Sequence, residues 1–159
     1  MKALCAVLIL IVSFVAVFVF FRGGDLGNQS KPREVSAEIM QRLTPPMLIG
    51  QSPKQIDESL LAQMTADEVD ILTLVHDRNF TFLQLTWVPV RKAWLAQLPE
   101  TACQAAYFDL IKFAEAYQRA ISDQLDEKLQ DQSDRAAMDY QEGKARCRAR
   151  AWHEVAGIE

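Results

Sequence analysis

The sequence has few of the residues that most often bind metals or carry catalysis: its 159 residues include two histidines and three cysteines. His76 and His153 lie far apart, and neither an H-E-x-x-H nor a C-x-x-C motif is present. The six glycines form no phosphate-binding loop, and the G-x-S-x-G turn of hydrolases is missing. We therefore expect no metal site, no cofactor and no catalytic constellation.

A basic excess is also missing. Seventeen Lys and Arg residues stand against 21 Asp and Glu, a formal net charge of −4. Dedicated nucleic-acid-binding proteins normally carry a basic excess, so we expect no nucleic-acid partner. Three cysteines are too few for a small scaffold held together by disulfides. An apolar share of 50% excludes a strongly disordered chain.

A long apolar stretch opens the chain. Residues 3–21 contain no charge and a single hydroxyl side chain, Ser13. A helix of this length spans roughly 28 Å, about the thickness of a hydrocarbon core. We predict a transmembrane signal-anchor over residues 1–22. A cleaved signal peptide is the alternative, but its apolar region is usually shorter, and residues 18–22 are too bulky for a cleavage site.

The orientation of this anchor is predicted from its short N-terminal tail. A count of basic residues favours a cytoplasmic body, because Arg22, Lys31 and Arg33 outnumber Lys2. However, long domains translocate largely regardless of charge, and a two-residue tail usually stays inside. We expect a cytoplasmic N-terminus and an extracytoplasmic body, which is periplasmic if the protein is bacterial.

After the anchor, the pattern predicts an all-α protein. Residues 23–35 are rich in Gly and polar residues and read as a flexible linker. Residues 36–159 should form a soluble domain, a small bundle of about five or six helices. The first is predicted over residues 36–43, ended by Pro45 and Pro46. Ser52 opens a second with a capping box, running to about Met64.

Two segments in the middle of the chain are harder to assign. A second capping box at Thr65–Glu68 predicts another helix that buries Val69, Leu72, Val75 and His76. Residues 79–90 have the composition of a strand, but no other segment reads as its partner. They also fit an apolar helical stripe, and we predict a helix that bends at Pro89. The stripe consists of His76, Phe80, Leu83, Trp87, Val90, Trp94 and Leu98.

The last third of the chain predicts two or more helices. Thr101 should start the longest one, whose apolar stripe runs from Cys103 through Tyr107, Leu110, Ala114, Tyr117 and Ile121 to Leu125. Beyond it the chain is acidic, and we expect a break around Asp131–Asp134. A final helix then carries Tyr140, Cys147, Ala151 and Val155 on one face.

Cys103 and Cys147 lie on the inward stripes of these two helices. If the body is in an oxidising compartment, the two cysteines can form a disulfide. The alternative is a pair of buried free thiols that pack as small apolar side chains.

Basic residues are concentrated in one run, from Lys144 to Arg150. Arg146, Arg148 and Arg150, with Trp152 just beyond, could bind an acidic partner or anionic headgroups. The competing explanation is intramolecular, with Glu142 pairing with Arg146 and Arg150 pairing with Glu154 in the same helix. Trp87 and Trp94 could form a second surface anchor with the neighbouring cations, although core packing is the usual role of such residues.

These features favour a membrane-anchored binding or scaffolding protein of the cell envelope. It would contact the membrane through residues 3–21 and another envelope protein through the Arg146–Trp152 region. A first alternative is a small envelope enzyme with a dispersed site for an anionic substrate near Arg91, Lys92 and His76. A second is a structural subunit of a membrane complex.

Overall fold

A computed structural model describes residues 33–48 and 50–156, with side chains up to Ala151. Over these residues the chain is all-helical, as predicted, and contains no strand. None of the helices in this part of the chain is long and apolar enough to cross a membrane. The predicted anchor, residues 1–22, and most of the predicted linker lie outside the described residues. The helices are α2 (Ala37–Arg42), α3 (Pro53–His76), α4 (Phe80–Phe82), a π-helical turn (Leu83–Trp87), α5 (Val88–Leu95), α6 (Ala102–Ser122) and α7 (Glu127–Ala156).

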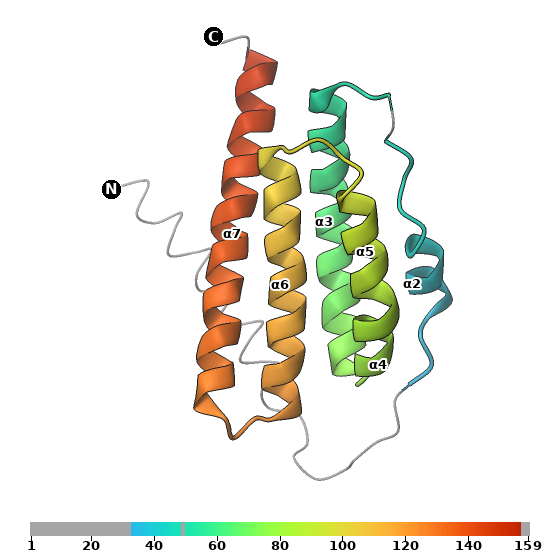
Figure 1. Cartoon of the computed structure of the whole chain (residues 1–159), viewed down its shortest axis with the longest axis vertical. Helices are drawn as coiled ribbons and strands as arrows, with labels where there is room; N and C mark the ends of the chain where they lie inside the picture. Colours follow the sequence, from blue (N-terminus) through green and yellow to red (C-terminus); the bar gives the residue numbers. More distant parts are fainter. Residues whose placement is uncertain (1–32, 49, 157–159) are drawn as a thin grey trace. The chain divides into compact units, whose positions relative to one another are not determined.

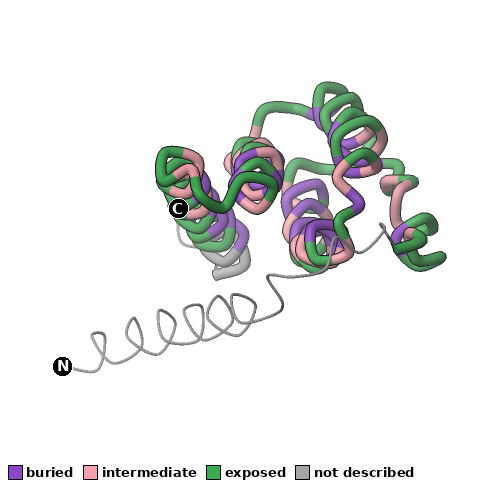
Figure 2. The backbone as a smooth tube through the Cα atoms, turned by 90° about the horizontal axis from the view of Figure 1, so that it is seen from below, coloured by how far each residue is buried: buried purple, intermediate pink, exposed green. Residues whose placement is uncertain are grey.

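Three long helices and one shorter rod run side by side along the bundle. The long ones are α3, α6 and α7, and the rod consists of α4, the π-helical turn and α5 (Figure 1). Helix α6 packs against both α7 and α3, and α3 also contacts α7. Viewed along the bundle, α6 lies between α7 and the pair formed by α3 and α5, with α2 at the far edge (Figure 2). Counting the rod once, the described chain contains five helical segments, within the predicted range.

Helix α3 is continuous, so the predicted helix start at Thr65–Glu68 is wrong. The Thr65 hydroxyl donates to the Leu61 carbonyl, 3.0 Å away, and therefore bonds within the helix instead of capping a new one. The start at Ser52 is confirmed. The Ser52 hydroxyl accepts from the Gln55 N–H, and the Gln55 side chain accepts from the Ser52 N–H at 3.0 Å.

The buried face of α3 also differs from the prediction. Val69 is 60% exposed, His76 is exposed and Leu72 is only half-buried. Two acidic residues, Asp67 and Asp70, are buried instead. The continuous helix explains this result. Leu60 and Met64 are buried, and the same helical spacing places positions 67, 71 and 74 on the same buried face.

Residues 80–95 are helical, so the prediction of a helix is confirmed and the alternative of a strand is wrong. The irregularity lies just before Pro89, where the Val88 N–H donates to the Leu83 carbonyl, five residues back. Proline has no N–H to donate and its ring crowds the preceding turn, and a wider π-helical turn accommodates both effects. Trp87, the last residue of this turn, and Trp94 are both buried in the core, so the alternative of an exposed tryptophan anchor is wrong.

Helix α6 begins where predicted but ends earlier. The Thr101 hydroxyl accepts from the Gln104 N–H at 3.1 Å, which caps the first turn. The helix ends at Ser122, so Leu125 leaves the apolar stripe and is 94% exposed. With 21 residues, α6 is shorter than α7, and the prediction that it is the longest helix is wrong.

Helix α7 runs unbroken for 30 residues, so the predicted break at Asp131–Asp134 is wrong. Its first turn is capped by Asp126, whose carboxylate accepts from the Lys128 N–H at 2.9 Å. Within the expected break, Ser133 is buried. It lies seven residues before Tyr140, which lies seven before Cys147, and all three face the bundle.

Candidate functional site

The exposed surface of α7 carries the basic residues that the sequence singled out. Arg146, Arg148 and Arg150, here called the arginine patch, are all exposed. A carboxylate oxygen of Glu142 lies 3.7 Å from an Arg146 guanidinium nitrogen, and the two side chains are 70% and 66% exposed. This ion pair confirms the predicted intrahelical contact, but one exposed pair contributes little and leaves Arg146 accessible. Trp152 belongs to α7, and its side chain lies outside the described part.

Lys144 is separate from the arginine patch, although it belongs to the same basic run. Its side chain is 7% exposed, and its Nζ lies 2.6 Å from the Glu68 carboxylate on α3. It also lies over the Tyr140 ring, 5.6 Å from the centroid. The Tyr140 hydroxyl donates to the same Glu68 oxygen at 2.5 Å. Lys144 therefore joins α7 to α3 and takes no part in the exposed surface.

A tight contact between α6 and α7 fixes the direction in which the arginine patch faces. Gly143 is buried, and a Cβ atom there would lie 3.2 Å from the Ala106 backbone of α6. Cys103 and Cys147 form a disulfide with an S–S distance of 2.00 Å and a Cα–Cα distance of 4.6 Å. Cys147 lies between Arg146 and Arg148, so when it faces α6, successive residues of the helix place these two arginines on opposite flanks of α7.

A buried ion pair between α3 and α5 is the main polar feature of the interior. The Arg91 and Asp67 side chains are both 0% exposed, with Arg91 Nε 2.7 Å from Asp67 Oδ2. Arg91 Nη2 lies 2.9 Å from Asp67 Oδ1, so the pair is bidentate. Gln63 donates to Oδ1 at 2.9 Å, and the Tyr107 hydroxyl donates to Oδ2. Donors from three side chains therefore bind both carboxylate oxygens.

The same arginine holds the N-terminal segment against the bundle. Arg91 donates to the carbonyl oxygens of Arg42 and Leu43, at 2.8 and 3.0 Å, and so binds the last turn of α2. The Arg42 side chain in turn pairs with Asp70 at 2.5 Å. Arg91 thus links α2, α3 and α5 and acts as a structural residue.

The titration of these groups follows from burial and the nearby charges. Burial lowers the pKa of Arg91, but its hydrogen bond to Asp67 and the charge of that carboxylate outweigh this effect and the net shift is upward. Burial raises the pKa of Tyr107, and the negative charge of Asp67 raises it further. Burial and the hydrogen bond to Glu68 raise the pKa of Tyr140. In the folded state, both tyrosines stay protonated well above their usual range.

Sequence reasoning missed the Arg91–Asp67 pair, although a signal for it was present. Arg91 lies four residues after Trp87 and four before Leu95, both of which are buried. Asp67 lies three residues after Met64 and four before Ile71 on the same apolar stripe. A charge on such a stripe from each of two helices predicts an internal ion pair.

The residues suggested for an enzyme site do not converge. Arg91 faces the interior, whereas Lys92 is on the outside and pairs with Glu115 of α6 at 2.8 Å. His76 is exposed at the end of α3. In the part of the chain that the structure describes, no three His, Cys, Asp or Glu side chains are placed to hold a metal ion.

One surface hollow adjoins the arginine patch. It lies at the start of α6, and Arg150 forms part of its wall. Its lining includes the half-buried Phe108 and the side chains of Glu100, Asp109 and Lys112. The Lys112 ammonium lies 2.8 Å from Asp109 Oδ1, so the charges on the rim pair with each other. The hollow is open to solvent and extends the exposed surface around the patch.

Comparison with known proteins found no relative. No family model matches the chain, and no curated protein or solved structure is significantly similar to it.

Proposed function

We propose that this protein is a membrane-anchored binding module of the cell envelope, which docks an acidic partner surface on the exposed part of α7 around the arginine patch. The exposed arginine patch is the observation that carries the proposal. Three guanidinium groups within five residues present fixed positive charge and several hydrogen-bond donors each, which suits carboxylate-rich partners. The apolar stretch at residues 3–21 supports the anchor, and the Gly-rich residues that follow it support a tether.

The design of the bundle supports a docking role for α7. The helix is joined to α6 by the Cys103–Cys147 disulfide and to α3 by Lys144 and Glu68. A rigid helix loses little conformational freedom when a partner binds its outer side, and this raises affinity for a given set of contacts. The disulfide also agrees with an oxidising compartment, where such bonds persist.

Affinity capture from the membrane fraction of the source cells tests the proposal. The full chain, tagged at its C-terminus, is compared with a variant carrying Arg146→Gln, Arg148→Gln and Arg150→Gln. A control with Lys54→Gln, Arg78→Gln and Arg119→Gln removes the same charge from surface positions outside α7. We expect the patch variant to lose a specific partner that the control keeps. Equal recovery of every partner by both variants would contradict the proposal.

A further inference from the structure

The charges of α7 are segregated along its length. Residues 127–142 contain five carboxylates against two cations, whereas residues 146–150 contain three arginines and no acid. Among the acidic residues, Asp131, Asp134 and Asp139 are exposed, as are the three arginines. The exposed surface of α7 is therefore negative over residues 127–142 and positive over residues 146–150.

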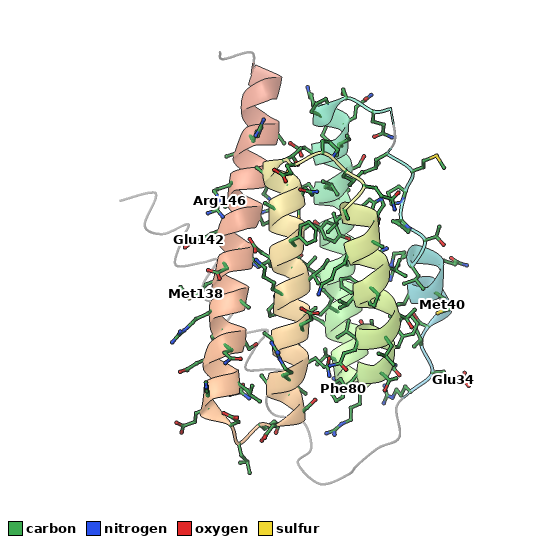
Figure 3. The ribbon with its side chains drawn as sticks, viewed as in Figure 1. Glu34, Met40, Phe80, Met138, Glu142 and Arg146 are labelled. Carbon is green, nitrogen blue, oxygen red and sulfur yellow. A yellow bond between two sulfur atoms is a disulfide. The ribbon has the colours of Figure 1, made fainter. Side chains whose placement is uncertain are left out.

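Within the described part of the chain, one side of α7 is exposed from residue 131 to residue 149. Six residues spaced by three or four form a straight row on this side, here called the outer row, and all are exposed. Met138, near its middle, is 64% exposed. Figure 3 shows Met138, Glu142 and Arg146 in succession along the side of α7 that faces away from α6. The outer row consists of Asp131, Arg135, Met138, Glu142, Ala145 and Ala149.

We infer that the outer row, together with the charged residues on its two flanks, is a docking surface for a second copy of this chain, with the two α7 helices antiparallel. This inference rests on the proposed function, because it names the acidic partner of the arginine patch as the first half of the same helix. In a parallel pair, arginine would face arginine and carboxylate would face carboxylate. In an antiparallel pair, each arginine patch meets the acidic half of the other copy, and one surface serves both partners.

The geometry of this pairing follows from the charge distribution. The exposed acids Asp131 and Asp134 pair with Arg148 and Arg146 of the other copy when the two-fold axis passes near position 140, between Met138 and Glu142 of the outer row. The contact is rich in exposed charge and poor in large apolar groups. The dimer is therefore weak and sensitive to salt, because exposed ion pairs are screened over about 10 Å at 0.1 M ionic strength.

Site-specific cross-linking tests the position of the axis. Met138→Cys is introduced into the full chain in detergent, in a Cys5→Ala background, and treated with a short bis-maleimide. The native disulfide does not react. The matched control is Leu85→Cys, because Leu85 is 73% exposed on the π-helical turn and lies outside α7. We expect covalent dimer from Met138→Cys at a yield at least about fivefold above the control. Equal yields would overturn the proposal.

A charge-swap series tests the electrostatic pairing by sedimentation of the full chain. Arg146→Glu with Arg148→Glu should weaken self-association about tenfold or more, and Asp131→Lys with Asp134→Lys should do the same. All four changes in one chain restore opposite charges across the antiparallel pair and should recover most of the affinity. Dimerisation that none of these variants alters, or a wild-type chain that stays monomeric, would overturn the inference.

The two proposals can fail separately. If the arginine patch serves a different acidic protein, the Arg→Gln variant loses that protein in the capture experiment while the wild-type chain sediments as a monomer. If the patch has no partner, neither experiment responds to its removal.

Discussion

At the residue scale, Asp67 has both carboxylate oxygens bound inside the protein, by Arg91, Gln63 and Tyr107. Desolvating a carboxylate and a guanidinium costs several kcal/mol for each ion, and only good geometry with further hydrogen bonds offsets this cost. Arg91 meets this requirement with two bonds to Asp67 and two more to α2 carbonyl oxygens. The pair specifies how α2, α3 and α5 assemble.

Removing one charge of this pair should strongly destabilise the fold. Asp67→Asn leaves the Arg91 charge buried without its counter-ion, and we expect a loss of about 3–5 kcal/mol in the free energy of unfolding. Glu115→Gln is the matched control, since it makes the same chemical change in the exposed pair with Lys92. It should cost less than about 1 kcal/mol. Urea unfolding measures both, and similar losses would show that the buried pair is not a major determinant of stability.

The buried tyrosines predict a loss of stability at alkaline pH. The pKa values of Tyr107 and Tyr140 are raised from 10.0 in the folded state, mainly by burial, so above about pH 10 unfolding releases their protons. The two protonated tyrosines contribute their full stabilisation below this pH, and this contribution is lost as the pH rises. Each such tyrosine lowers the free energy of unfolding by about 1.4 kcal/mol per pH unit. Urea titrations at several alkaline pH values should show Tyr107→Phe with a slope shallower by that amount; an unchanged slope would contradict this account.

At the element scale, the two capping boxes in the sequence differ in their structural role. Ser52 caps a real helix start, whereas Thr65 lies inside α3 and bonds back to Leu61. Ser52→Ala should therefore cost about 1 kcal/mol of stability. Thr65→Ala should be neutral or slightly stabilising, because alanine has the higher helix propensity. Thermal unfolding of both variants checks this expectation, and a loss of about 1 kcal/mol for Thr65→Ala would mean that a helix starts there.

The disulfide between α6 and α7 should make a large contribution to stability. It closes a loop of 44 residues, for which the chain-entropy model gives on the order of 4 kcal/mol. Cys103→Ala with Cys147→Ala should lower the free energy of unfolding by a comparable amount while leaving the helix content unchanged. Circular dichroism during urea unfolding reports both quantities. A double variant as stable as the wild type would show that the bond is dispensable.

Local signals in the sequence predicted where helices start better than they predicted where a helix continues without a break. Ser52, Thr101 and the apolar stripes located helix starts correctly, because capping and periodicity act within one or two turns. The same logic placed a false start at Thr65 and a false break at Asp131–Asp134. In both places, contacts with other helices favour continuity: Asp67 and Glu68 bind residues of α5 and α7, and Ser133 packs into the seam of α7.

At the scale of the whole molecule, the described chain is an all-α bundle whose interior is fixed by ion pairs and a disulfide, and whose α7 presents a charged outer surface. The arginine patch was predictable, because three arginines in five residues stand out in an acidic chain. The inward turn of Lys144 was not, because it depends on Glu68 of a distant helix. Which partner binds the patch is decided by the complementary surface on that partner, and the capture and cross-linking experiments would identify it.

Photo-cross-linking in living cells tests most directly whether the outer side of α7 is an interaction surface. A photoreactive amino acid replaces Ala149, which is exposed between Arg148 and Arg150, and a parallel chain carries it at Leu85. The account predicts a discrete adduct from position 149 that is absent from position 85, and its mass shows whether the partner is a second copy or another protein. No adduct at position 149, or the same adducts at both positions, would contradict it.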